Sequence, residues 1–389
     1  MHRCLPAAAR LPSVLRDLLL ICAPLFCALF LAIVPPAAQS QDIRIQGPGS
    51  PPEIGFACCD KGIAPMQALF ATPGLIAQLR QLHALVAVAI TDFSPERADT
   101  VHMLNREQIP AVAWIMLSSE DGVYLNAGNA PAAATRIKAF EKWTADNNLH
   151  WAAVGLDIEP DFDELSRLNR HKWRLITTLV SRSFDGPRIV RAQQAYSQII
   201  HELQAHGFTV QTYQMPYRPA ERGTHTSLVD RLLGTVDVKG NIEYLMVYTS
   251  FARPIGAGMI WSLGPGEQGI TVGVTDGATT PGVGSGPLDW NEFSRDLIVA
   301  SHFTNHIGVY NLEGAVQQSF MPRLLAMDWN QSVTIPAAQI ARARRMRFLS
   351  HAVLLTMTYL PWLVVAGVLL IAWLIRRRWV RKRQVALPA

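Results

Sequence analysis

The chain has 389 residues, 49% of them hydrophobic and 17% charged, which is enough to bury a full core in one large domain or two small ones. The formal net charge is +5, but most of the basic excess flanks one apolar run near the C-terminus, so little is left to bind nucleic acid. We therefore expect no nucleic-acid partner. The basic residues on the two sides of that run are Arg342, Arg344, Arg345, Arg347, Arg376, Arg377, Arg378, Arg381, Lys382 and Arg383.

Residues 1–40 have the pattern of an export signal. Three arginines precede an uncharged run over residues 18–34, and the small residues Ala38 and Ser40 follow at positions suited to cleavage. The uncharged run is long for a cleaved signal, so an uncleaved signal anchor is the alternative. Either form directs the rest of the chain out of the cytoplasm.

Eight short runs rich in Val, Ile, Ala and Tyr follow within residues 41–333. Near-continuous apolar runs of this length are typical of strands that are covered on both faces, as in a parallel sheet. The sequence therefore predicts one domain built on eight parallel strands. These strands are expected at residues 53–58, 84–91, 110–117, 151–159, 208–215, 242–249, 269–276 and 306–313.

Longer amphipathic segments separate the predicted strands. Residues 64–83 and 130–149 carry apolar residues at helical spacing, residues 289–303 begin with the N-cap candidate Asp289, and residues 163–206 are long enough for two helices. Eight alternations of strand and helix predict an α/β fold, a (β/α)8 TIM barrel over residues 41–333. A doubly wound open sheet is the alternative, although no Gly-rich phosphate-binding fingerprint follows the first strand.

Beyond the barrel, the sequence predicts a basic juxtamembrane segment at 334–351, a transmembrane helix at 352–375 and a basic cytoplasmic tail at 376–389. Residues 352–375 contain no charged residue, and as a helix they would extend roughly 36 Å, enough to cross a bilayer with some tilt. The larger basic cluster follows this span. Together with the export signal, it predicts that the barrel lies in the periplasm or outside the cell.

The sequence predicts neither a metal site nor a cofactor. Cys58 and Cys59 are adjacent, which suits neither an ordinary disulfide framework nor a metal site, so they form either a vicinal disulfide or two packed thiols. His302 and His306 lie four residues apart, but the sequence places no third ligand beside them. A G-x-S-x-G elbow for a Ser-His-Asp hydrolase is also missing from the sequence.

The segment "WAAVGLDIEP", residues 151–160, is an apolar strand that ends in two carboxylates. Alternate residues of a strand share a face, so Asp157 and Glu159 point the same way as the small residues Ala153 and Gly155. This face suits a barrel interior, and it brings both acids to the carboxyl end of the strand, where barrel enzymes have their active sites. Two acids this close do not both ionise readily, so one should hold a raised pKa, as a general acid requires. The alternative is a helix cap or a surface acid cluster.

This strand resembles the fourth-strand signature of the family 18 glycoside hydrolases, the chitinase-like enzymes, which ends in Asp-x-Asp-x-Glu. Asp157 and Glu159 match the last two acids, whereas Gly155 and Ala152 occupy the two earlier aspartate positions. A D-x-E at the end of a barrel strand is also similar to lysozyme-like family 25 enzymes. "IEP" is similar to the Asn-Glu-Pro of the large retaining-glycosidase clan, with the Asn absent.

The sixth predicted strand adds to the chitinase-like resemblance. Its "LMVYT" resembles the Met-x-Tyr-Asp of the family, with Met246 and Tyr248 matching and Thr249 replacing the aspartate. The family's tryptophan on the last strand is not evident, and Tyr310 or Asn311 stands there. The resemblance in strand order covers most of residues 53–315.

The resemblance implies a division of roles. Glu159 would protonate the glycosidic oxygen, Asp157 would steer and stabilise an N-acetyl group of the substrate as that group attacks the anomeric carbon, and Tyr248 would hydrogen-bond the same group. A substrate without an acetamido group would instead need a second carboxylate as nucleophile. Asp276 or Glu313 could serve in that position.

Other candidate substrate-binding residues lie near predicted strand ends. Aromatic and amide side chains there suit sugar stacking and hydrogen bonding, although aromatic residues in strands more often belong to the core. Asp92 closes the second strand and is either catalytic support or a helix cap. The full candidate set is Trp114, Tyr213, Gln214, Met246, Asp92, Tyr310 and Glu313.

These features predict a membrane-anchored, extracytoplasmic glycoside hydrolase that acts on a polysaccharide by a retaining mechanism. The chitinase-like resemblance implies N-acetylhexosamine as one candidate sugar of that polysaccharide. The C-terminal helix would supply its contact with the membrane. The alternative is a catalytically inactive barrel that binds a glycan or a protein partner. The missing outer acids and Thr249 favour that alternative.

Overall fold

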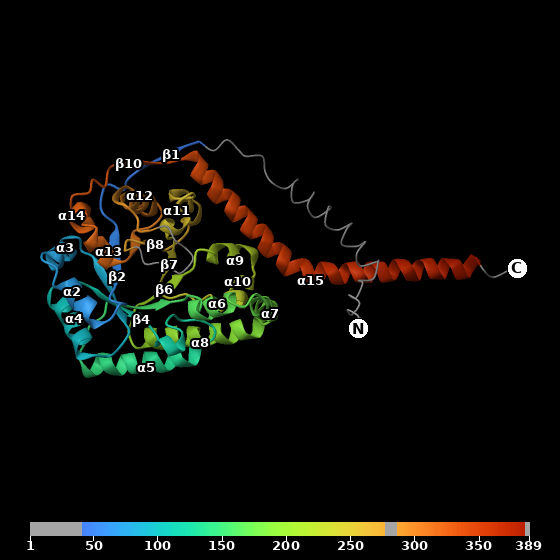
Figure 1. Cartoon of the computed structure of the whole chain (residues 1–389), viewed down its shortest axis with the longest axis horizontal. Helices are drawn as coiled ribbons and strands as arrows, with labels where there is room; N and C mark the ends of the chain where they lie inside the picture. Colours follow the sequence, from blue (N-terminus) through green and yellow to red (C-terminus); the bar gives the residue numbers. More distant parts are fainter. Residues whose placement is uncertain (1–40, 277–285, 386–389) are drawn as a thin grey trace, which may run out of the picture. The chain divides into compact units, whose positions relative to one another are not determined.

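The computed structural model describes residues 41–276 and 286–385, and eight parallel strands within this part form a closed barrel (Figure 1). Each strand pairs with its neighbours in chain order, and the last strand pairs with the first to close the sheet. The predicted TIM barrel is therefore confirmed, and the open doubly wound sheet is excluded. The strands are β2 (Glu53–Cys58), β3 (Leu85–Ile90), β4 (Ala111–Ile115), β5 (Ala153–Asp157), β6 (Val210–Gln214), β7 (Ile242–Met246), β8 (Gly269–Gly273) and β9 (His306–Tyr310).

Helices follow the strands and cover the outside of the barrel (Figure 1). Two 3-10 helices, Ser119–Asp121 and Thr249–Ala252, lie in the loops after β4 and β7. The α-helices between the strands are α2 (Ile63–Phe70), α3 (Leu75–Gln81), α4 (Pro95–Arg106), α5 (Ala130–Asp146), α6 (Phe162–Asn169), α7 (Lys172–Ser183), α8 (Gly186–Ala205), α9 (Arg218–Thr224), α10 (Leu228–Leu233), α11 (Ala257–Leu263) and α12 (Trp290–Ser301), and β9 is followed by α13 (Leu312–Gln317) and α14 (Phe320–Leu325).

Two predicted helical segments are divided more finely than expected. The segment 64–83 contains two helices, because Pro73 cannot continue α2 and Gly74 adopts a left-handed φ of 80° before α3 begins. The segment 163–206 contains three helices, α6, α7 and α8, instead of two. The N-cap predicted at Asp289 is confirmed, since its side chain accepts from the backbone of Glu292 in a reciprocal capping box.

The apolar residues form two separate cores, as the strand alternation predicts. On β5, Val154 and Leu156 belong to the large core between the barrel and its helices. Ala153 belongs to a smaller core inside the barrel, together with Trp114 and Met116 of β4 and its extension. Gly155 must remain small, because a Cβ there would lie 3.1 Å from the ring of Tyr213. The inward face of β5 is therefore the one that continues to Asp157.

A two-stranded antiparallel sheet outside the barrel joins the two ends of the domain. It pairs β1 (Ile43–Gln46) with β10 (Ser332–Ile335), and neither strand is predicted from the sequence. Ile45 and Ile335 are buried, so this sheet packs on the core although its other residues are largely exposed. Four-residue strands that alternate in burial give only a weak sequence signal. Strand β10 crosses the domain boundary predicted at residue 333.

A long helix, α15 (Ala337–Val385), follows β10, and its first part packs on α11 and α9 (Figure 1). Within the described residues no single helix is long and apolar enough to cross a membrane. Two segments of α15 together are long and apolar enough by length and composition alone, and they meet at a bend of 47°. These segments are Ala337–Leu360 and Val365–Arg377. The predicted span at 352–375 falls across this bend.

A buried ion cluster fixes α9 and α10 against the barrel. Arg218 is 1% exposed, and its guanidinium donates two hydrogen bonds to Asp230, at 2.7 and 2.8 Å, and one to Glu221 at 3.4 Å. The neutral form of Glu221 is favoured, because burial and the nearby charge of Asp230 raise its pKa to about 8. Arg218 is thus the cation on which this buried cluster depends.

We expect Arg218→Met to lower the free energy of unfolding by about 3–5 kcal/mol, because the carboxylate of Asp230 stays buried without its partner. Thermal unfolding of the full-length protein measures this. Arg191→Met, at an exposed position on α8, is the matched control and should change stability by less than about 0.5 kcal/mol. Equal effects of the two substitutions would show that the cluster does not stabilise the fold.

Candidate functional site

The end of β5 is held in place by backbone hydrogen bonds from both sides. Leu125, in the loop after β4, donates to the carbonyl of Asp157 at 3.0 Å and accepts from the amide of Glu159 at 3.1 Å. Ile158 donates to the carbonyl of Tyr213 at 3.1 Å. Backbone that is fixed in this way cannot turn outward when the strand ends. Asp157 and Glu159 are therefore held at the carboxyl end of the barrel, as the sequence predicts.

The two carboxyl groups strongly affect each other. Burial raises the pKa of Glu159 well above its usual value, and the neighbouring charge of Asp157 raises it further. Burial also raises the pKa of Asp157, whereas a hydrogen bond from Trp114 lowers it in part, because that bond favours the ionised form. Asp157 is 5% exposed, and its Oδ1 has no hydrogen-bond partner among the described residues. The pair can therefore hold one proton on Glu159 beside a carboxylate on Asp157, the arrangement that acid catalysis requires.

Aromatic side chains surround this pair. The ring of Tyr248, at the end of β7, lies 5.9 Å from that of Tyr310 at the end of β9, and Trp114 meets Tyr310 edge-on at 6.2 Å. The pKa of Tyr248 is raised well above its usual value by burial and by the charges of Asp157 and Glu159, so its hydroxyl stays protonated and can donate a hydrogen bond. Rings around carboxyl groups suit the apolar faces and hydroxyl groups of a sugar.

A second polar group lies at the ends of β2, β8 and β9. Lys61 forms a 2.7 Å ion pair with Asp276, which also accepts a 2.8 Å hydrogen bond from Asn311. Asp60 accepts a 3.1 Å hydrogen bond from the hydroxyl of Tyr310, and its Oδ1 has no partner among the described residues. This group therefore meets the aromatic residues at Tyr310.

Tyr124 connects the two sides electrostatically. Burial raises its pKa, and the charges of Glu159, Asp157 and Asp60 raise it further. Carboxyl groups from both sides therefore lie within electrostatic range of the Tyr124 hydroxyl. Asp60, Lys61 and Tyr124 are not among the site residues predicted from the sequence. The sequence does offer one signal for Asp60 as a site residue, since it lies two residues after the first strand of the barrel. Tyr124 lies in a loop, and no sequence pattern predicts the path of that loop.

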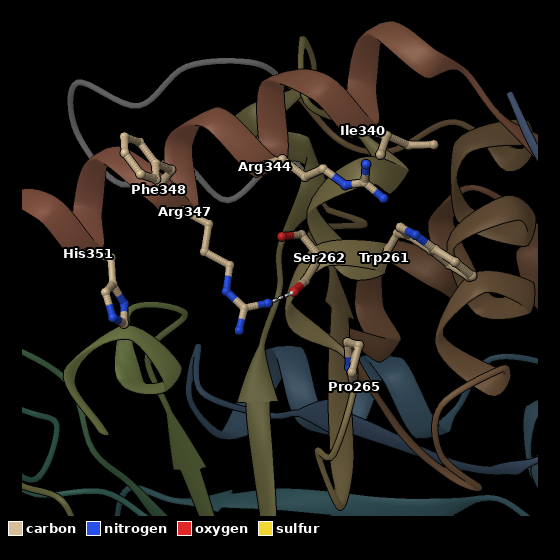
Figure 2. A pocket seen from close by; sticks show the side chains of 8 residues that line it. All are labelled: Trp261, Ser262, Pro265, Ile340, Arg344, Arg347, Phe348 and His351. Carbon is tan, nitrogen blue, oxygen red and sulfur yellow. Dashed lines mark hydrogen bonds between the residues drawn. The ribbon is translucent and has the colours of Figure 1, made fainter. Parts of the chain in front are cut away.

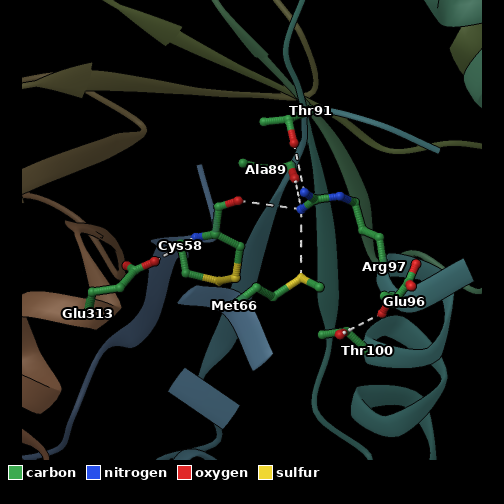
Figure 3. The surroundings of a disulfide bond; sticks show 9 residues. Cys58, Met66, Ala89, Thr91, Glu96, Arg97, Thr100 and Glu313 are labelled. Carbon is green, nitrogen blue, oxygen red and sulfur yellow. Dashed lines mark hydrogen bonds between the residues drawn. A yellow bond between two sulfur atoms is a disulfide. The ribbon is translucent and has the colours of Figure 1, made fainter. Parts of the chain in front are cut away.

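Cys58 and Cys59 form a disulfide at the end of β2, which decides between the two alternatives for these residues (Figure 3). The amide of Cys59 donates to Glu313 at 2.7 Å, and its carbonyl accepts from the fully buried Arg97 at 3.4 Å. Arg97 also bonds Asp92 at 3.0 Å. The disulfide segment is thereby tied to α13 on one side and to α4 on the other, which positions Asp60 beside it.

The predicted substrate-binding residues have different surroundings in the structure. Trp114, Tyr310 and Tyr248 lie together near Asp157, and Met246 is buried on the inward face of β7. Tyr213 is inside the barrel, stacked on Tyr244 with ring centroids 5.2 Å apart. Its ring still lies close enough for the charge of Asp157 to raise its pKa.

Gln214 and Asp92 do not reach this group. Gln214 is fully buried on the outward face of β6, where it donates to the carbonyl of Val238 and accepts from Arg218. Asp92 pairs with Arg97 and accepts a hydrogen bond from the amide of Ser94. The N-cap of α4 is Ser94 itself, so Asp92 holds the turn before the helix and is not its cap. Both side chains stabilise the fold around the barrel, and we do not assign them to a substrate.

Glu313 is partly buried beside the disulfide, and burial raises its pKa. Its Oε2 has no hydrogen-bond partner among the described residues. His302 lies against Trp261 and Phe303, whereas His306 pairs with Glu53 at 2.9 Å, so the two histidines have separate neighbours.

The raised pKa of Glu159 predicts a pH-dependent gain of stability in Glu159→Gln. The folded state binds this proton more tightly than the unfolded chain, so the contribution of Glu159 to stability is fully present below its usual pKa and is lost as the pH rises toward the folded-state pKa. Each unit of difference corresponds to about 1.4 kcal/mol. We expect the variant to melt at a higher temperature than the wild type at pH 8 and at the same temperature at pH 4. An equal gain at both pH values would contradict the raised pKa.

Comparisons with known proteins give weak likenesses. No family model and no curated protein matches the chain. The glycoside hydrolase domain of PgaB (BpsB) from Bordetella bronchiseptica is 9% identical, with 71% of this chain and 98% of that chain covered and a TM-score of 0.42. D-allulose 3-epimerase from Methylomonas sp. is 12% identical, with 78% and 100% covered and a TM-score of 0.36. At such scores we conclude nothing about activity from these likenesses, and the barrel assignment depends on the closed strand order itself.

Proposed function

We propose that the chain is a glycoside hydrolase whose acid is Glu159 and whose second catalytic group is Asp157. The observation that supports this most is the carboxyl pair at the end of β5, in which burial and mutual charge raise the pKa of Glu159. A surface acid cluster or a helix cap would leave these carboxyl groups hydrated. The actual N-cap of α6 is Asp161, whose side chain accepts from Glu164, so the pair is not needed for capping.

In the proposed reaction, Glu159 donates its proton to the glycosidic oxygen as the bond to the anomeric carbon breaks. Positive charge then develops on the sugar, and the ionised Asp157 stabilises it from the same end of the barrel. Tyr248 donates a hydrogen bond to the substrate, since its hydroxyl stays protonated beside these acids. After the leaving group departs, Glu159 accepts a proton from the attacking water, which returns the pair to its starting state.

The retaining mechanism has two possible nucleophiles. If the sugar carries an acetamido group, the oxygen of that group attacks the anomeric carbon and Asp157 supports the cation that forms. If it does not, a carboxylate from the opposite side is required. Asp60 and Glu313 then fit better than Asp276, because each has one oxygen without a hydrogen-bond partner among the described residues. Asp276 is bound to Lys61 and Asn311.

A catalytically inactive, glycan-binding barrel is the second candidate. Thr249 supports it, because the residue at this family aspartate position is buried and donates its hydroxyl to Asp296 instead of facing the carboxyl pair. A panel of polysaccharides with and without N-acetyl groups separates the two functions. Release of reducing ends from one class supports the hydrolase, and binding to a glycan without any release over prolonged incubation supports the inactive barrel.

We also propose that the barrel lies outside the cytoplasm and is attached to the membrane by residues 352–375. The support is the export-signal pattern at 1–40, which lies outside the described residues, and the basic cluster after the span. We expect alkaline phosphatase fused after Ser350 to be active, and green fluorescent protein fused after Gln384 to fluoresce. Activity of alkaline phosphatase fused after Gln384 would contradict this topology.

A further inference from the structure

The first turns of α15 form a cationic cavity of about 370 Å³ with α11 (Figure 2). Arg344 and Arg347 extend from α15 toward Trp261 and Ser262, and His351 lies one turn further along the helix (Figure 2). Arg347 donates one hydrogen bond to the carbonyl of Ser262 at 2.7 Å, which fixes its guanidinium at the cavity wall. Two arginines directed at one space provide the donors that bind a phosphate ester.

The negative charge near this cavity is weak. None of the residues that line it within the described chain is acidic. The charge of Arg347 does act on Glu267, but burial and the nearby Glu243 raise the pKa of Glu267 to about 7, so its carboxylate is only partly ionised near neutral pH. An anionic ligand in the cavity would therefore meet the arginines with little competition from the protein.

A second cavity, of about 330 Å³, adjoins the first on α15 and is mostly apolar. Ser262 and Arg347 line both cavities, so the two share a wall. A hydrocarbon chain would fit the second cavity while a charged group stays in the first. The apolar side chains around it include Val229, Met259, Leu263, Met346, Val353 and Leu354.

The position of these cavities along α15 matches the surface of a bilayer. Arg347 lies five residues before Ala352, where the proposed span begins, which is about 7.5 Å along the helix axis. The headgroup layer on each side of a bilayer is roughly 5–8 Å thick. The arginines would therefore lie at the depth of lipid phosphates.

An exposed apolar face on α7 supports the same orientation. Helix α7 contacts α10, which in turn contacts α15, so α10 connects the two helices. All three are labelled in Figure 1. Trp173 is 80% exposed and Phe184 at its end is 72% exposed, with Ile176 and Val180 exposed between them. Large apolar side chains in water are unfavourable, whereas at a membrane interface they are stable.

We propose that these two cavities form a binding site for one anionic phospholipid, with its phosphate between Arg344 and Arg347 and an acyl chain in the apolar cavity. The proposal depends on the proposed membrane attachment and not on hydrolysis. Such a bound lipid would hold α15 against α11 and fix the barrel relative to the bilayer.

Native mass spectrometry tests the site. The full-length protein in detergent is mixed with dioleoyl phosphatidylglycerol or with dioleoyl phosphatidylcholine, and the lipid that stays bound after the detergent is removed is measured. We expect the anionic lipid to bind at least tenfold more tightly. Arg344→Gln should weaken its binding about tenfold, since a hydrogen bond to a charged group is lost. Arg345→Gln is the matched control, because Arg345 is exposed on the next position of α15 and lines neither cavity.

The arms of this experiment separate the alternatives. Equal weakening by Arg344→Gln and Arg345→Gln would show attraction by overall charge and overturn the site. Glycerol phosphate without acyl chains should bind at least a hundredfold more weakly, and equally tight binding would overturn the lipid assignment in favour of a free phosphate ester. Arg347→Gln also removes the bond to Ser262, so Arg344→Gln is the variant that leaves the docking of α15 intact. The measurement needs no glycan turnover, and its failure is thus distinct from failure of the proposed hydrolase.

Discussion

Glu159→Gln is expected to lower kcat for glycan hydrolysis about 10²–10⁴-fold, the usual contribution of general acid–base catalysis. The amide keeps the shape of the side chain but has no acidic proton to donate to the leaving group. KM should change little, because the substrate contacts proposed for Tyr248, Trp114 and Tyr310 remain. Rates of reducing-end release from the polysaccharide identified in the panel measure this.

Glu120→Gln provides the control for Glu159→Gln. Glu120 is exposed in the loop after β4, so the same chemical change occurs near the barrel mouth without touching Asp157 and Glu159. We expect wild-type kcat in this variant. Similar losses in both variants would show that charge around the mouth matters and that Glu159 has no separate role.

Asp157→Asn is expected to lower kcat almost as much as Glu159→Gln, by about 10²–10³-fold, because it removes the negative charge that stabilises the developing cation. It should also lower the pKa of Glu159, since burial would then act without the neighbouring carboxylate. The basic limb of the pH–rate profile would therefore move to lower pH. This shift is a readout that a purely structural role of Asp157 would not produce.

Asp163→Asn, at the exposed start of α6, is the control for Asp157→Asn and should leave both the rate and the profile unchanged. Inhibition by a thiazoline then distinguishes the two nucleophiles. Strong inhibition of the wild type supports attack by the acetamido group. No inhibition by the thiazoline, together with full activity on unacetylated glycans, would support a carboxylate nucleophile. Asp60→Asn would then test whether Asp60 is that nucleophile.

The barrel could be predicted from sequence because its strands are regular. Eight apolar runs at helix-length spacing predict a parallel sheet and favour a closed barrel over an open one, and the structure closes it. The alternation in β5 also predicts that Val154 and Leu156 face the helices while Asp157 faces inward. The strands β1 and β10 were missed, because a pair of four-residue strands separated by nearly the whole domain has no local pattern.

The candidate site could be predicted only in part, for a physical reason. Strand residues such as Asp157 are placed by their period, whereas Asp60 and Tyr124 are placed by loops whose paths depend on tertiary contacts. Gln214 shows the opposite error. It closes a strand, as expected, but it lies on the outward face, where Arg218 uses its side-chain oxygen. Adjacent residues of a strand point to opposite faces, and Tyr213 points into the barrel, so Gln214 must point outward.

The dependence of the rate on the leaving group tests the role of Glu159 most directly. Aryl glycosides of the sugar identified in the panel, with phenols of decreasing pKa, need progressively less protonation as the bond breaks. We predict a shallow dependence of kcat on phenol pKa for the wild type and a steep one for Glu159→Gln, with the variant approaching wild-type rates for the most acidic phenols. Equal slopes for the two proteins would contradict proton donation by Glu159.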